Sequence, residues 1–283
     1  MGLGLGRLAA TQSWTDLRSR LISAVILGIA VLVLTFVGGL AFRLLCCAAS
    51  VIVFDEWTRM TRAKRAGDIY IFARRALYLS LAAFFFGFHG WALAIVGASA
   101  AFIAVVDRGE HKANWVLGGL VYAATAGMAP GILRDSGAEG LAALGLVICI
   151  VWATDIFAYF FGRTFGGPKL MPMVSPKKTI SGALGGLLFG VLFGIGFEYW
   201  LTGDVSALVL VLSGILSIVG QAGDLFESWV KRRFGVKDSG RLIPGHGGLM
   251  DRIDALIIST GVLLLVGLLG SGIDHPARAI FDF

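Results

Sequence analysis

The chain has 283 residues, of which 57% are hydrophobic and only 15% are charged, with a formal net charge of +6. Ordinary globular domains carry about 25% charged residues, so this composition excludes a soluble globular protein. A membrane-spanning helix needs roughly 20 consecutive apolar residues, and the chain contains many such blocks. The blocks are continuous rather than alternating, which argues against a membrane β-barrel. We therefore predict an all-α integral membrane protein, built as a polytopic bundle of transmembrane helices.

Nine membrane-spanning helices are predicted along the chain, although a count of eight is also defensible. The expected ranges are 21–39, 40–54, 69–86, 90–106, 115–133, 141–161, 180–200, 205–222 and 255–271. The first two are joined tightly around Gly38 and Gly39, which suggests a hairpin. About five spans form an N-terminal region, 1–140, and about four form a C-terminal region, 141–283, which we predict to be catalytic.

Lysine and arginine residues are distributed unequally between the two sides of the predicted membrane. A cytoplasmic N-terminus assigns most of the 24 basic residues to cytoplasmic segments and leaves only Arg43, Arg134 and Arg278 on the opposite side. Cytoplasmic segments of membrane proteins are enriched in Lys and Arg. The distribution therefore favours a cytoplasmic N-terminus, and it places two long polar loops, 162–179 and 223–254, in the cytoplasm.

Glycines recur every four residues along the predicted span 180–200. They are Gly182, Gly186, Gly190 and Gly194. This spacing puts all four on one smooth helix face, which predicts close packing against a neighbouring helix. A substrate groove along the same face is the alternative.

Asp155 lies inside the predicted span 141–161, about two turns from its cytoplasmic end. An ionisable residue at this depth is costly to insert and is a functional candidate by default. Helical spacing places Tyr159 and Arg163 on the same face as Asp155. A purely structural contact among these three side chains is the alternative.

Three further acids lie at the cytoplasmic ends of predicted spans. Asp224 follows the span 205–222, and Asp251 and Asp254 precede the span 255–271. Acids at a helix N-terminus are favoured by the helix dipole, so a capping role is the alternative for Asp251 and Asp254. Carboxylates gathered from several helix ends, together with Asp155, suit Mg²⁺ with phosphate co-ligands.

Basic and glycine residues precede two of the predicted spans. "SPKKT" places Lys177, Lys178 and Thr179 before the span 180–200, and "GHGG", residues 245–248, precedes the last span. Helix N-termini offer free N–H groups to phosphate, and glycines let the backbone approach it closely. Unspecific binding of anionic lipid is the alternative for the lysines, and His246 is open between base, phosphate ligand and loop residue. These features indicate phosphoryl or nucleotidyl transfer to a lipid.

The stretch "KDSGRLIPGHGGLMDRID", Lys237 to Asp254, carries a resemblance to a known family. With Ser228 and Lys231 upstream, it resembles the signature of the phosphatidate cytidylyltransferases, the CDP-diacylglycerol synthases. "DIFAYFFGR" and "SPKKT" resemble the other stretch that this family shares. The chain departs from many members at Ile180-Ser181, where they have Trp-Glu. The matched stretches cover residues 150–255.

The resemblance implies an enzyme that converts CTP and phosphatidate to CDP-diacylglycerol and pyrophosphate. It implies a Mg²⁺ cofactor, with a second cation left open, and a bundle of transmembrane helices that forms a homodimer. The expected partners are CTP, phosphatidate and membrane lipids, and no nucleic acid. The compact chain suits a bacterial inner membrane, with the active site on the cytoplasmic face.

The resemblance also implies roles for particular residues. The expected catalytic residues are Asp224, Asp251, Lys237 and His246. The expected metal ligands are Asp224 and Asp251, with Asp155 and Asp254 as further candidates. The expected substrate-binding residues are Arg163, Ser175, Lys177, Lys178, Thr179, Ser228, Lys231, Gly247, Gly248 and Arg252.

Two other functions are compatible with parts of this pattern. A CTP-dependent lipid kinase would transfer the γ-phosphoryl group and release CDP instead of pyrophosphate. A multi-pass transporter would account for intramembrane acids and glycine-rich helices. The predicted acids gather at one membrane face rather than at the midplane, which disfavours transport.

Overall fold

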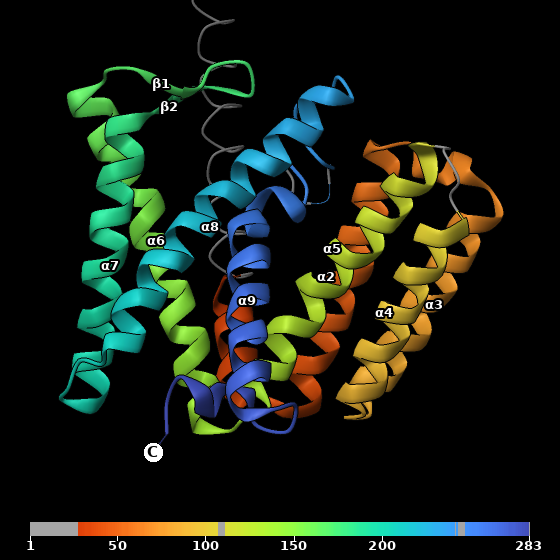
Figure 1. Ribbon diagram of the computed structural model, residues 1–283, viewed down its shortest axis with the longest axis horizontal. Coiled ribbons are helices and arrows are strands. Elements are labelled where there is room, and N and C mark those ends of the chain that lie inside the picture. Colours follow the sequence, from red (N-terminus) through yellow and green to blue (C-terminus); the bar gives the residue numbers. More distant parts are fainter. Residues whose placement is uncertain (1–27, 107–110, 241, 243–246, 283) are drawn as a thin grey trace, which may run out of the picture.

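The computed structural model describes residues 28–106, 111–240, 242 and 247–282, and the chain in these ranges is almost entirely helical (Figure 1). The long helices are α2 (Gly39–Met60), α3 (Asp68–Phe85), α4 (His89–Val106), α5 (His111–Arg134), α6 (Ala138–Phe165), α7 (Ile180–Thr202), α8 (Ala207–Arg233) and α9 (Met250–Ser271). The smaller elements are a helical segment Gly28–Val37, two 3₁₀ helices, η1 (Ala63–Ala66) and η2 (Pro276–Ala279), and two strands, β1 (Lys169–Met171) and β2 (Ser175–Thr179).

Within the described ranges, six helices, α4 to α9, are long and apolar enough to cross a membrane. They coincide with six of the predicted spans, so the prediction of a helical membrane protein is confirmed. The helices α2 and α3 lie over the predicted spans 40–54 and 69–86 but carry charged residues among their apolar ones, such as Glu56 and Arg74. The predicted span 21–39 is described only from Gly28 onward. The total of nine spans therefore stays a prediction.

The helix α9 lies at the centre of the bundle. It packs against α8 on one side and α5 on the other, while α6 packs on α7 and α2 packs on α5 (Figure 1). The C-terminal ends of α6 and α8, the first turn of α9 and the β1–β2 hairpin lie at the same end of the bundle, the top of Figure 1. We call this end the site end, because the chain brings most of its predicted functional residues there.

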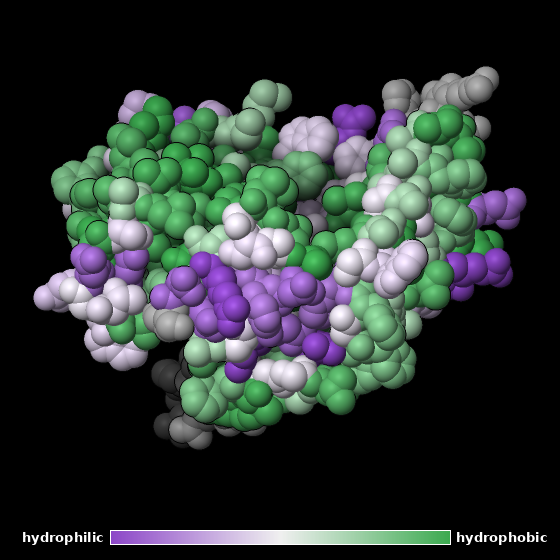
Figure 2. All heavy atoms as spheres, turned by 60° about the horizontal axis from the view of Figure 1, so that its bottom comes forward, coloured by the Kyte–Doolittle hydropathy of each residue, from purple (hydrophilic) through white to green (hydrophobic). Residues whose placement is uncertain are grey.

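The opposite end of the bundle has a separate charged group. Asp135 accepts a hydrogen bond from Arg43 Nε at 2.8 Å, and His89 Nε2 lies 3.0 Å from the same carboxylate. Figure 2 shows this end, where hydrophilic side chains form a central area with hydrophobic side chains around it. An apolar belt between two polar ends is the arrangement expected of a protein that spans a bilayer.

The glycine stripe of α7 packs against α6 and α8. A Cβ atom at Gly186 would lie 2.8 Å from the Thr154 carbonyl oxygen, and one at Gly190 would lie 3.0 Å from Ser217 Oγ. Thr154 and Ser217 themselves share a hydrogen bond of 2.8 Å beneath the stripe. The prediction of close helix packing is confirmed, and no space remains along the stripe for a substrate.

Gly190→Leu should therefore weaken the bundle. Forcing a large side chain into a packed interface costs about 1–3 kcal/mol or more, so the melting temperature in detergent should fall clearly. Gly196 is the matched control, because it lies on the same helix and a Cβ atom there would meet nothing within 4 Å. Equal melting temperatures for Gly190→Leu and Gly196→Leu would contradict the packing.

Two segments at the site end differ from prediction. "SPKKT" forms strand β2, which pairs antiparallel with β1, whereas the prediction placed it in the loop 162–179. The helix α8 continues to Arg233, well beyond the predicted limit at residue 222. Hydropathy locates the apolar part of a helix, whereas the last turn of α8 carries the basic residues Lys231, Arg232 and Arg233.

Candidate active site

Charged side chains from three elements meet at the site end. Lys178 of β2 forms an ion pair with Asp224 of α8. Lys231, two turns further along α8, binds both Glu227 at 3.0 Å and Asp251 of α9 at 2.8 Å. The two lysines thus join the hairpin to α8 and α8 to α9. Asp224 and Asp251, the two acids predicted as the main metal ligands, each form an ion pair with a lysine.

The extended α8 explains why these side chains share one surface. Asp224, Ser228 and Lys231 are spaced three to four residues apart, which puts them on one helix face. Ser228 Oγ also lies 3.4 Å from Asp224 Oδ1. Residues that we predicted to lie in a loop are therefore held on a rigid helix, and this helix aims them at α9 and at the hairpin.

Asp155 of α6 and Asp254 of α9 complete the group. The Asp155 carboxylate lies within electrostatic range of Asp224, Asp254 and Lys178. Asp254 also contacts Glu227 directly. We call the five carboxylates of Asp155, Asp224, Glu227, Asp251 and Asp254 the acid cluster. Among the residues that the structure describes, these five carboxylates outnumber the two lysines that form ion pairs with them.

Asp251 also organises the signature loop, residues 237–249. Its carboxylate accepts hydrogen bonds of 2.9 Å from both Ser239 N and Gly248 N. Gly247 adopts φ +85°, and a Cβ atom there would lie 2.7 Å from Asp251 Oδ2. The glycine is required because the carboxylate lies so close to the backbone.

Glu56 of α2 is a residue of the site that the sequence interpretation missed. Its buried carboxylate accepts hydrogen bonds from Leu249 N at 2.9 Å and Met250 N at 2.8 Å, and from Ser239 Oγ at 3.3 Å. A Cβ atom at Gly240 would lie 2.6 Å from Glu56 Oε1. The N-terminal region therefore holds the signature loop in place. The sequence feature that could have identified Glu56 is its position as an acid directly after an apolar run.

The N–H groups that lead into α9 consequently have partners within the protein. Gly248 N donates to Asp251, and Leu249 N and Met250 N donate to Glu56. We had predicted that "GHGG" would present free N–H groups to a phosphate. Residues 245 and 246, including His246, lie outside the described residues, and at Gly247 and Gly248 the glycines accommodate the protein's own carboxylates instead.

Tyr122 of α5 is a second residue that the sequence interpretation missed. Its buried hydroxyl has no hydrogen-bond partner among the residues that the structure describes. The group lies within electrostatic range of Glu227 and Asp254. A tyrosine in an apolar run gives no sequence signal, because only the helix arrangement turns its hydroxyl toward the acid cluster.

Other predicted residues take varied positions. Arg163 lies on the same face as Tyr159, as predicted, and donates to the Tyr159 hydroxyl at 2.6 Å. Thr179 caps α7 by accepting a hydrogen bond of 3.1 Å from Gly182 N. The remaining predicted residues are Ser175, partly buried on β2, and the exposed Lys177, Lys237 and Arg252.

The acid cluster has oxygen ligands of the kind that a divalent cation prefers. Within the described ranges, no three His, Cys, Asp or Glu side chains are arranged to hold a metal ion by themselves. Mg²⁺ is commonly held by only one or two carboxylates, with substrate phosphates and water as further ligands. Glu227 Oε1 is buried and has no partner in the described structure, and it lies in a cluster with excess negative charge. This donor set fits a hard divalent cation.

The fold and the site together define a polytopic helical membrane protein with a half-buried cluster of carboxylates and lysines at one end of its bundle. The chain belongs to the cytidylyltransferase family, whose model matches residues 18–269. It is 38% identical to the phosphatidate cytidylyltransferases of Brucella suis and Brucella melitensis over 271 residues, which cover 95% of this chain and 100% of each relative. It is also 41% identical to the enzyme of the same name from Staphylococcus saprophyticus over 126 residues, 44% of this chain and 48% of that protein.

The family resemblance inferred from the sequence is thus confirmed. The similarity extends beyond the predicted range 150–255 and includes the N-terminal helices. Glu56, which holds the signature loop, lies in this additional part.

Proposed function

We propose that this chain is a phosphatidate cytidylyltransferase, which transfers CMP from CTP to phosphatidate and releases pyrophosphate. The observation that carries the proposal is the similarity to the Brucella enzymes over 95% of this chain and their entire length. The clustering of the signature acids and lysines at one end of the bundle supports it, because a triphosphate and a lipid headgroup require countercharge at one place.

The reaction requires little acid–base catalysis. A phosphate oxygen of phosphatidate attacks the α-phosphorus of CTP, a new P–O bond forms, and the bond to the β-phosphate breaks to release pyrophosphate. The nucleophile is already an anion, so no strong base is needed. The barrier comes from bringing two anions together and from charge on the leaving group, which positioning and electrostatic stabilisation reduce.

We assign the acids of the site to metal binding and its lysines to phosphate binding. Asp224 and Asp251 would hold Mg²⁺, with Asp155 and Asp254 as further acids, and the bound ion would neutralise phosphate charge. Lys178 and Lys231, now paired with those two carboxylates, would turn to phosphate oxygens when substrates bind. Their ion pairs keep both ammonium groups at the site and pre-oriented in the absence of substrate. A second cation and a homodimer remain predictions.

We also propose that the site end faces the cytoplasm. The basic residues Arg59, Lys64, Arg163 and Lys177 lie in the segments at this end, and such segments are retained on the cytoplasmic side. CTP is water-soluble and would enter from there. The bacterial relatives support a location in a bacterial inner membrane.

The test uses purified protein in mixed micelles with phosphatidate, Mg²⁺ and CTP labelled at the α-phosphate. We expect label in the lipid fraction and pyrophosphate in the aqueous phase. Labelled CDP without labelled lipid would instead identify a lipid kinase. Intact CTP with folded protein would refute the enzyme and would direct attention to transport.

Metal removal should abolish this transfer. Because the acid cluster carries excess negative charge, two anionic substrates should not bind productively without a cation. We expect activity to fall to background after chelation with EDTA and to return when Mg²⁺ is added in excess. Full activity of the chelated protein would contradict the cation site.

A further inference from the structure

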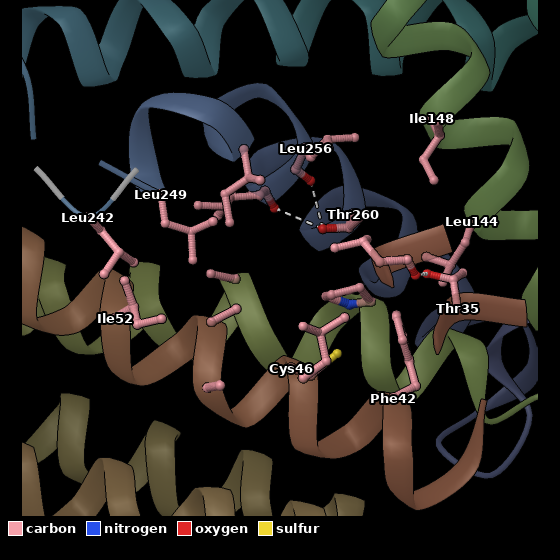
Figure 3. A pocket seen from close by; sticks show the side chains of 18 residues that line it. Thr35, Phe42, Cys46, Ile52, Leu144, Ile148, Leu242, Leu249, Leu256 and Thr260 are labelled. Carbon is pink, nitrogen blue, oxygen red and sulfur yellow. Dashed lines mark hydrogen bonds between the residues drawn. The ribbon is translucent and has the colours of Figure 1, made fainter. Parts of the chain in front are cut away.

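A cavity of about 290 Å³ lies beside α9 (Figure 3). Its walls come from the segment Gly28–Val37, α2, α5, α6 and α9. Leu242 and Leu249 of the signature loop line one end. Figure 3 shows side chains from these separate helices pointing into one common space, which we call the apolar groove.

Among the described residues that line the groove, no polar side-chain group is buried without a hydrogen-bond partner. Thr35 and Thr260 carry its only hydroxyls, and each donates within its own helix, Thr35 to the Val31 carbonyl at 2.8 Å and Thr260 to the Leu256 carbonyl at 2.7 Å (Figure 3). A nucleotide or headgroup would lose its hydrogen bonds in such a space. The lining therefore fits hydrocarbon.

The groove begins next to the proposed reaction site. Leu249 lines it with its side chain while its N–H group donates to Glu56. Ile253 also lines it and directly precedes Asp254 of the acid cluster. On α9, one helix face thus borders the groove while the adjacent face borders the acids.

The groove extends along α2. Its α2 wall runs from Ile52, near the signature loop, to Phe42, and the alanines Ala48 and Ala49 leave room between them. Ten residues of helix correspond to about 15 Å, roughly the length of a chain of twelve methylene groups. One extended acyl chain matches this length.

We propose that the apolar groove binds one acyl chain of the lipid substrate, with the lipid phosphate emerging at the signature loop. The inference rests on the proposed function. Lipid tails are equally well solvated by the bilayer, so burial in the groove adds little affinity. Its effect is to position the lipid, which sets the distance between the phosphate and the α-phosphorus of CTP.

The test blocks the groove and varies the chain length of the lipid. Ala48→Phe places a ring in the groove at an exposed position of α2. We expect kcat/KM for dioleoyl phosphatidate to fall between about fivefold and a hundredfold, the range of a small misplacement of reacting groups. Dibutanoyl phosphatidate has chains too short to reach Ala48 from the signature loop, so its kcat/KM should stay within twofold.

The matched control is Ala41→Phe, because Ala41 is exposed on the same helix and does not line the groove. This variant should leave kcat/KM unchanged for both lipids. Ala48→Leu fills less of the groove and should give an intermediate loss of kcat/KM for dioleoyl phosphatidate. This variant replaces Ala48→Phe in the test if Ala48→Phe does not fold. Equal losses on both lipids, or no loss on either, would overturn the acyl-chain site. Absence of CMP transfer by the unmodified protein with both lipids would instead refute the proposed function.

Discussion

Asp251→Asn should reduce CMP transfer by at least about 10²–10³-fold, the cost of removing a group that stabilises reacting charge. Asp251 is the acceptor for Lys231, Ser239 N and Gly248 N. Asparagine keeps one acceptor oxygen but not the negative charge that a cation requires. The measurement is kcat and the Mg²⁺ concentration for half-maximal activity, in detergent-purified protein.

The control for this variant is Asp55→Asn. Asp55 is an acid of α2 at the same end of the bundle, but it pairs with Arg59 at 2.6 Å and Lys64 at 2.9 Å, outside the acid cluster. We expect it to retain normal turnover. Normal turnover by Asp251→Asn, at ordinary Mg²⁺ concentrations, would rule out a ligand role for this residue.

Glu56→Ala should produce the second large loss of activity, although Glu56 lies on a helix that is far from the signature loop in sequence. Removing its carboxylate leaves Leu249 N, Met250 N and Ser239 Oγ without their acceptor. Each unsatisfied buried donor costs about 1–3 kcal/mol, so the loop should relax away from this arrangement. We expect kcat to fall by about 10²-fold, because the loop carries Asp251 and its neighbours.

Two variants separate this positioning role from general stability. Glu56→Gln retains a carbonyl oxygen in the same place and should recover part of kcat. Glu198 is a matched residue at the opposite end of the bundle, buried, and bonded to Ser206 N at 3.0 Å and Ser206 Oγ at 2.7 Å. Glu198→Ala should lower the melting temperature comparably but leave kcat near normal. If both alanine variants lose the same small amount of activity, Glu56 acts only on stability.

Asp251 and Glu56 both hold the signature loop through hydrogen bonds. Asp251 binds it from within α9, and Glu56 binds it from α2, so Ser239 contacts both through its N–H and its hydroxyl. Gly240 and Gly248 leave the space that these carboxylates occupy. The glycine-rich signature is thus explained in part by contacts within the protein, besides any approach of a phosphate.

The sequence by itself determined the class of protein, the family and most members of the charged site. Long apolar blocks specify membrane helices wherever they occur, because the bilayer accepts few other structures. Lys178, Asp224 and Asp251 were candidates by residue type and position, Lys231 was a candidate by the family resemblance, and the structure brings these four together.

Only the tertiary structure decided how these residues are paired and what holds them. Which lysine meets which acid depends on how α8 lies against α9 and the hairpin, and hydropathy carries no information on that arrangement. The same holds for Glu56 and Tyr122, which reach the site because α2 and α5 pack beside α9. Their roles follow from distances between helices that are remote in sequence, and such distances arise only when the bundle has assembled.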